Sequence, residues 1–205
     1  MKHDDPTALP AAKPRRLLHE RSIKCDGYLR DDGLWEVEAH LCDTKTFDYI
    51  EPVRGPLEAG GAIHDMALRL TFDDDLIIVD AAAAMAATPM LACRDVRLHI
   101  AKVKGVKVGA GWRKEVKERI GRRDSCTHLM DLMAPAITTL YQTMGMGKDP
   151  DGCNSLDRLW ATGERPHFLD GCHGWRLDGN AVRTLFSDWA TPSGGAAGQS
   201  PQEPP

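Results

Sequence analysis

The amino-acid sequence predicts an α+β fold, in which a small antiparallel β-meander carries helices on one face and the C-terminal third is irregular. The first half of the chain contains segments in which apolar and polar residues alternate, and this pattern is typical of half-buried strands. The second half contains apolar residues three or four positions apart, a spacing that is typical of amphipathic helices. Strands followed by helices indicate an α+β protein.

The predicted meander has three strands. Residues 34–41 alternate, and their apolar side consists of Trp35, Val37, Ala39 and Leu41. Residues 66–81 are expected to form an antiparallel hairpin. The segment MALRLTF alternates in the same way, aspartates form the tip, and the apolar run LIIVDA returns.

The helices are expected in the second half of the chain. Residues 90–103 have apolar residues at helical spacing, with a strand as the alternative. Trp112, Val116 and Ile120 recur every fourth residue and predict a short amphipathic helix. The clearest helix covers 126–143, and a less regular one is expected near 180–189.

Both ends of the chain are expected to be disordered tails. Residues 1–15 carry three prolines and mixed charge, and residues 191–205 are rich in proline, glycine and serine. The residues between them, 16–190, are enough for a single domain of ordinary size.

The composition excludes several classes of protein. Hydrophobic residues make up 42% of the chain, which suffices for a core, and no apolar run reaches the length of about 18 residues that a membrane helix needs. The net charge of −4 argues against binding polyanions by bulk charge. The N-terminus has no apolar stretch of the secretory kind. Six cysteines without such a signal indicate a reducing compartment, and we expect the cytoplasm.

Cys126 is the strongest candidate for chemistry. It opens the clearest helix, for which Asp124 or Ser125 is the expected N-cap. Unpaired backbone N–H groups and the helix dipole favour a thiolate there, the form that attacks substrates and binds metals. His128 follows two residues later, and Asp131 is close enough to orient its imidazole. The structural alternative is a small buried hydrophobe beside a surface histidine.

His64 and Asp65 form a second candidate pair. They lie in the segment GGAIHDM, whose two glycines permit a tight loop before the hairpin. Neighbouring side chains of an extended chain point to opposite faces, so we expect one of the two to face a site. Cys93 is the weakest candidate, because a cysteine in an apolar segment most often serves packing.

Short motifs with a known mechanism are absent from the sequence, including CxxC, HExxH, the P-loop, GxGxxG and GxSxG. A closed zinc ribbon is therefore not expected. A functional site would have to be assembled from distant segments.

Several segments resemble a bacterial family of unknown function. They are YLRDDGLWEVEAHLCDTK, GGAIHDMALRLTFDDDLIIVDAAAAMAATPMLAC, GAGW and CTHLMDLM. They are similar to the family called domain of unknown function 2889, over roughly residues 15 to 190. This resemblance implies no activity.

A remoter resemblance is to the NifU/IscU-type iron–sulfur scaffolds. In those proteins a Cys-Gly-Asp loop enters a strand, an I-x-D-A turn follows, and a late cysteine opens the last long helix. Here His64 and Asp65 take the places of the first Cys and Asp, residues 78–81 match the turn, and Cys126 matches the late cysteine. The resemblance implies an iron–sulfur-related site, but an imidazole replaces one thiolate and Cys93 is displaced.

Two functional hypotheses use these residues. The first is a metal site for zinc or iron, with His64, Cys93 and Cys126 as ligands and Asp65 or His128 beside them. The second is a metal-free lyase or hydrolase for a small acyl or aromatic substrate. In it, Cys126 is the nucleophile, or His64 and His128 form an acid–base pair.

A third hypothesis rests on a basic segment. From Lys102 to Arg123, nine basic residues stand against two glutamates, a net charge of +7. Such a segment attracts a small anionic molecule, an acidic protein partner or nucleic acid. Nucleic acid is the least expected partner, because aromatic residues are not interleaved for base stacking. The structural alternative is a solvated amphipathic face.

Overall fold

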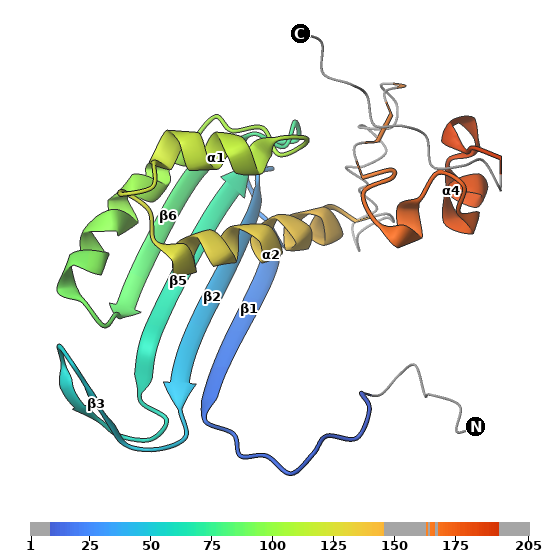
Figure 1. Ribbon diagram of the computed structural model, residues 1–205. Coiled ribbons are helices and arrows are strands. Elements are labelled where there is room, and N and C mark those ends of the chain that lie inside the picture. The colour runs from blue at the N-terminus through green and yellow to red at the C-terminus, as the bar shows by residue number, and fades with distance from the viewer. Residues whose placement is uncertain (1–8, 146–162, 164, 167, 193–205) are drawn as a thin grey trace, which may run out of the picture.

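A four-stranded antiparallel sheet in the order β1-β2-β5-β6 forms one layer of the fold, and helices cover one of its faces (Figure 1). This arrangement confirms the predicted α+β class. The computed structural model describes residues 9–145, 163, 165–166 and 168–192. The strands of the sheet are β1 (His19–Leu29), β2 (Trp35–Lys45), β5 (Ala62–Phe72) and β6 (Ile78–Ala87). A small separate hairpin, β3 (Tyr49–Glu51) and β4 (Gly55–Leu57), connects β2 to β5.

The two central strands form where alternation predicts them. The apolar side of β2 is buried from Trp35 to Leu41, and the same holds for β5 from Met66 to Phe72. Antiparallel pairing of β5 with β6 confirms the expected hairpin. Because side chains alternate between faces, one face of the sheet enters the core while the other carries charged residues.

The sheet has one more strand than predicted. β1 pairs with β2 along its whole length, with Arg21 opposite Asp43 and Gly27 opposite Val37. All of its residues are exposed or only partly buried. An edge strand of this kind shows no apolar alternation, and for this reason the sequence pattern does not reveal it.

Three helical segments cover the buried face of the sheet: η1 (Leu91–Val103), α1 (Trp112–Ile120) and α2 (Thr127–Met144). The expected helices at 112–120 and 126–143 are confirmed, and 90–103 is helical but of the 3-10 type. α2 packs against β1, β2 and β5, while η1 packs against β6 (Figure 1). The buried side chains of α2 include Leu129, Leu132, Met133, Ala136, Ile137 and Leu140.

The described C-terminal part contains η2 (His173–Trp175), α4 (Asn180–Leu185) and η3 (Ser187–Trp189). A helix near 180–189 is thereby confirmed as two short pieces. The rings of Phe168, Trp175 and Phe186 pack together, with centroids 5.1 to 5.8 Å apart. Most of the expected tails, residues 1–8 and 193–205, lies outside the described residues, and a single domain over 16–190 stays a prediction.

Among the described helices, none is both long and apolar enough to span a bilayer.

Close packing of β1 against α2 generates a stability prediction. A Cβ atom on Gly27 would lie 1.7 Å from Oγ1 of Thr143, so a side chain there forces strand and helix apart. We expect Gly27→Ala to lower the free energy of unfolding by about 1–3 kcal/mol. Urea denaturation measures the change. Gly109→Ala is the matched control, because a Cβ on Gly109 meets no atom within 4 Å. Equal stability of the two variants would contradict this packing.

Candidate functional site

Three charged or ionisable side chains form a row across the buried face of the sheet. Arg21 on β1 lies opposite Asp43 on β2, and Asp43 lies opposite His64 on β5. Directly opposite residues of antiparallel strands project to the same face, so the register alone brings the three together. A register irregularity between Asp43 and Thr44 marks this end of the sheet. Irregularities of this kind are frequent next to functional sites.

Asp43 is the centre of the row, and its side chain is only 1% exposed. The Arg21 guanidinium donates from Nε to Oδ1 at 2.7 Å and from Nη2 to Oδ2 at 2.8 Å. These hydrogen bonds are the largest cause that lowers the pKa of Asp43, and the charge of Arg21 and hydrogen bonds from His64 and His19 act in the same direction. Against the opposing effect of burial, they together bring this pKa from 3.8 to about 2. The carboxyl group is therefore ionised at neutral pH.

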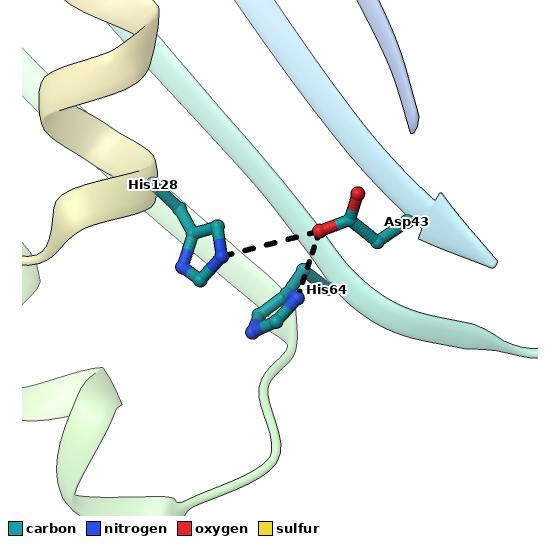
Figure 2. A group of neighbouring side chains, drawn as sticks. All are labelled: Asp43, His64 and His128. Carbon is teal, nitrogen blue, oxygen red and sulfur yellow. Dashed lines mark hydrogen bonds and ion pairs between the residues drawn. The ribbon is translucent and has the colours of Figure 1, made fainter. Parts of the chain in front are cut away.

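The ionised carboxylate determines the tautomer of His64. Nδ1 of His64 lies 2.9 Å from Oδ2 of Asp43, and an ionised carboxylate only accepts hydrogen bonds. Nδ1 must therefore carry the proton. In neutral His64, Nε2 holds the free lone pair, and Figure 2 shows this nitrogen pointing away from Asp43. The side chain of His64 is 15% exposed, so the site is partly open to solvent.

His128 comes to the same place from the first turn of α2. Its ring lies 3.8 Å from the His64 ring, centroid to centroid, with an angle of 32° between the ring planes (Figure 2). Its Nε2 is 4.0 Å from Oδ2 of Asp43, too far for a hydrogen bond but within reach of the charge. Burial lowers the pKa of His128, and electrostatic interactions with His64 and Arg21 add to this effect. The ring is therefore a neutral imidazole at neutral pH.

Cys126 stands at the beginning of α2, as the sequence predicts for a helix opening here. It is itself the N-cap, with extended backbone angles. Neither Asp124 nor Ser125 takes that role, so this expectation is wrong: Asp124 binds Lys102, and Ser125 donates to the carbonyl of Arg122. The thiol of Cys126 is partly buried and lies 3.9 Å from Nδ1 of His128.

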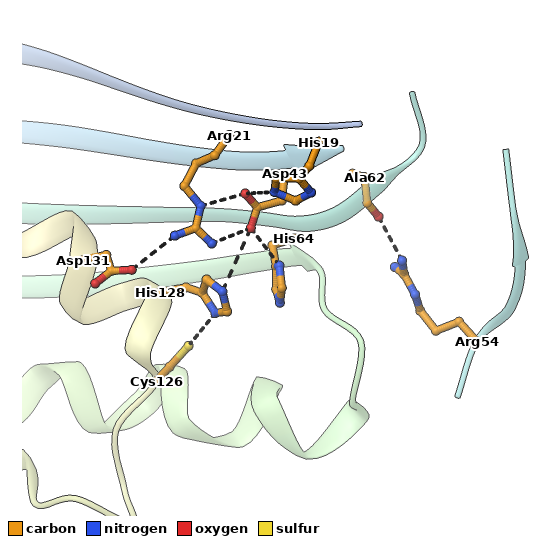
Figure 3. Close-up of polar contacts among 9 residues, drawn as sticks. All are labelled: His19, Arg21, Asp43, Arg54, Ala62, His64, Cys126, His128 and Asp131. Carbon is orange, nitrogen blue, oxygen red and sulfur yellow. Dashed lines mark hydrogen bonds and ion pairs between the residues drawn. The ribbon is translucent and has the colours of Figure 1, made fainter. Parts of the chain in front are cut away.

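Asp131 has a different partner from the expected one. Its carboxylate accepts from Nη1 of Arg21 at 3.3 Å, so Arg21 joins α2 to the sheet (Figure 3). The expectation that Asp131 hydrogen-bonds and orients His128 is not met. His19, on β1, completes the group with Nε2 at 3.3 Å from Oδ1 of Asp43.

Two of the predicted site residues lie elsewhere. Asp65 points to the opposite face of the sheet from His64, as expected for neighbours in a strand, and accepts from Nε2 of His40 at 2.7 Å. Cys93 lies in η1 and packs against the hydrophobic core. Asp65 therefore does not share the site with His64, and the thiol of Cys93 serves packing.

Asp43 and Arg21 are the site residues that the sequence reasoning missed. Asp43 continues the buried alternation of Trp35, Val37, Ala39 and Leu41 by one step, so an acidic residue at a core position is a signal present in the sequence. Arg21 gives no such signal, because β1 lacks an apolar pattern.

The arrangement permits two kinds of chemistry. Asp43, His64 and His128 each offer one possible ligand atom, and these three atoms lie within 4.8 Å of one another. This spacing suits a metal ion. Without a metal, two imidazoles beside one buried carboxylate can take up and release protons.

The depressed pKa of Asp43 generates a pH prediction. A carboxyl group with a pKa of about 2 stabilises the fold above its ordinary pKa of 3.8, and this stabilisation disappears as the pH falls towards 2. We expect Asp43→Asn to lose less stability than wild type between about pH 5 and about pH 2, by about 2 kcal/mol. Urea denaturation at both pH values measures this difference. Asp131→Asn, at an exposed carboxylate, is the control and should follow wild type. An Asp43→Asn variant as acid-sensitive as wild type would refute the assignment.

The comparisons with known proteins identify a family. A search of curated proteins finds no match, and a search of solved structures finds none either. The likeness to NifU/IscU scaffolds is accordingly not shown. The family model described as "Protein of unknown function (DUF2889)" matches residues 19–142, which run from the beginning of β1 to the last turn of α2 and include every residue of the site. The chain therefore belongs to the DUF2889 family.

Proposed function

We propose that the protein is an enzyme that removes a proton from a small organic substrate and returns one to it. His64 and His128 would be the acid–base pair, and no metal would be resident. The observation that carries this proposal is the contact of both imidazoles with one ionised, buried carboxylate. Each ring turns one nitrogen towards Asp43 and the other away from it (Figure 2).

Asp43 prepares His64 for the role of a base. By accepting from Nδ1, it holds the ring in one orientation and leaves the lone pair of Nε2 for a substrate proton. The imidazolium that forms is stabilised by the carboxylate. Arg21 keeps this carboxylate ionised and in place through its two hydrogen bonds.

His128 is suited to a different step. Its lowered pKa keeps it neutral, and two stacked rings do not carry two positive charges at once. When one imidazole is protonated, the other therefore stays neutral, so that an acid and a base stand side by side. Cys126 adds a thiol 3.9 Å from Nδ1 of His128, which supplies a nucleophile if the substrate is an acyl compound.

A nitrobenzisoxazole tests the proposal without knowledge of the natural substrate. A base takes its C–H proton, the N–O bond breaks, and the coloured phenolate reports the rate. We expect wild type to catalyse this reaction, and both His64→Gln and His128→Gln to lower the rate at least about 10-fold.

His40→Gln is the matched control for this experiment. His40 also pairs with an aspartate, but on the opposite face of the sheet. Its loss should leave the rate unchanged. Equal rates in all three variants would show that the proton transfer does not occur at this site.

A metal centre is the second candidate function, favoured by the close approach of the three ligand atoms. Zinc or iron would be bound by Asp43, His64 and His128, with a position left for substrate. Two features place it second. Arg21 already neutralises Asp43, and the stacked histidine rings present faces rather than nitrogens to each other.

Metal content decides between the two candidates. We expect protein purified without chelator to hold less than about 0.2 equivalents of zinc or iron per chain, and its stability to be unchanged when either ion is added. One equivalent in wild type that is lost in His64→Gln and kept in His40→Gln would establish the metal centre instead.

The described cysteines support an intracellular setting for this chemistry. Cys25, Cys42, Cys93, Cys126 and Cys172 are all free thiols. Because free thiols persist in reducing compartments, we propose that the enzyme acts in the cytoplasm.

A further inference from the structure

A hollow of about 440 Å³ lies between the end of α1 and the beginning of α2. Its lining residues are Lys117, Ile120, Gly121, Arg122, Ser125, Thr127, Met130 and Asp131. Cys126 stands in sequence between two of them. The hollow therefore adjoins the segment that brings Cys126 and His128 into the site.

The basic residues at this hollow differ from most of their neighbours in the 102–123 segment. Lys102, Lys104, Lys114 and Arg119 each have a carboxylate partner. Within the part of the chain that the structure describes, Lys117 and Arg122 form no ion pair. Their charges are thus available for a ligand, and two cations on one rim favour an anion.

The interior of the hollow is suited to an apolar group. Ile120 is only 3% exposed and belongs to the hydrophobic core. Met130 is partly buried and packs against the same core. Such a surface favours an aliphatic or aromatic body over a fully hydrated ion. The hydroxyl groups of Ser125 and Thr127 add hydrogen-bonding capacity at the rim.

Asp131 connects the hollow to the acid–base site. It lines the hollow, and its carboxylate accepts from Arg21, which holds Asp43 (Figure 3). Because Arg21 partly neutralises the carboxylate of Asp131, that carboxylate repels a bound anion less strongly. Lys117 and Arg122 line the same hollow without an ion pair in the part of the chain that the structure describes, so the positive charges of the lining remain for a bound anion.

We propose that this hollow binds the carboxylate end and apolar body of the substrate, which makes the substrate a small amphipathic carboxylate. The inference rests on the proposed acid–base function, because it describes the substrate of that site. Arg122 and Lys117 would hold the carboxylate, and Ile120 and Met130 would contact the apolar body.

Benzoate is the probe for this binding, followed by the backbone amide NMR signals of full-length protein. We expect the signals of Gly121, Ser125 and Thr127 to shift with benzoate concentration. Arg122→Gln should weaken the affinity about fivefold or more. Arg123→Gln is the control, because Arg123 is also an exposed arginine of this loop but does not line the hollow.

Two further ligands test the chemistry of the site. Benzamide has the same ring without the charge, and inorganic phosphate has charge without an apolar body. Both should bind more weakly than benzoate. The inference is overturned if either binds as tightly, or if Arg123→Gln weakens benzoate binding as much as Arg122→Gln does.

His64→Gln separates this inference from the proposed function. It should leave benzoate affinity unchanged while it slows proton transfer. Benzoate without effect on the hollow, together with proton transfer that depends on His64, would overturn the substrate inference alone. Benzoate bound at the hollow in a protein without proton transfer would overturn the acid–base function and leave the hollow as a binding site for a carboxylate that is not the substrate of His64.

Discussion

The carboxylate of Asp43 lies almost fully buried at the end of the helix-covered face of the sheet, where a charge needs partners at hydrogen-bonding distance. Arg21 provides two hydrogen bonds and the opposite charge, and His64 and His19 provide further donors. Removal of the arginine alone would leave the buried carboxylate without the guanidinium charge and without two of its hydrogen bonds. The strands that carry these residues therefore have to keep their register, because a slip of one residue would turn the side chains to the other face.

The one-sided covering of the sheet explains where the site lies. α2 crosses β1, β2 and β5, and its first turn ends above the row of Arg21, Asp43 and His64. Elsewhere this face is filled by apolar side chains from both layers. At the beginning of α2 the side chains between helix and sheet are polar, and His64 and His128 remain partly exposed there. The same position thus combines a buried carboxylate with rings that a small molecule can reach.

The strand and helix patterns could be predicted because each depends on local periodicity. Trp35 to Leu41 alternate since the strand is covered on one side, and the apolar spacing of α2 follows from the same covering. β1 could not be predicted in this way, because an exposed edge strand is formed by pairing with β2 and not by burial of its own side chains. The residue type of Cys93 does not decide its role, since a thiol suits a metal but also fills space in a core, and Cys93 packs against the core.

By itself, the sequence predicted the fold class, the central hairpin and the helix that begins after Cys126, and it named two of the three residues that gather at Asp43, namely His64 and His128. Their roles were not determined, because each histidine gains its properties from Asp43, which is far away in the chain. Only the tertiary structure decided that His64 faces the helices while Asp65 faces away, and that Arg21 compensates the carboxylate between them. The physical reason is that strand periodicity is a property of neighbouring residues, whereas a pKa and a hydrogen bond depend on side chains that the sheet register brings together.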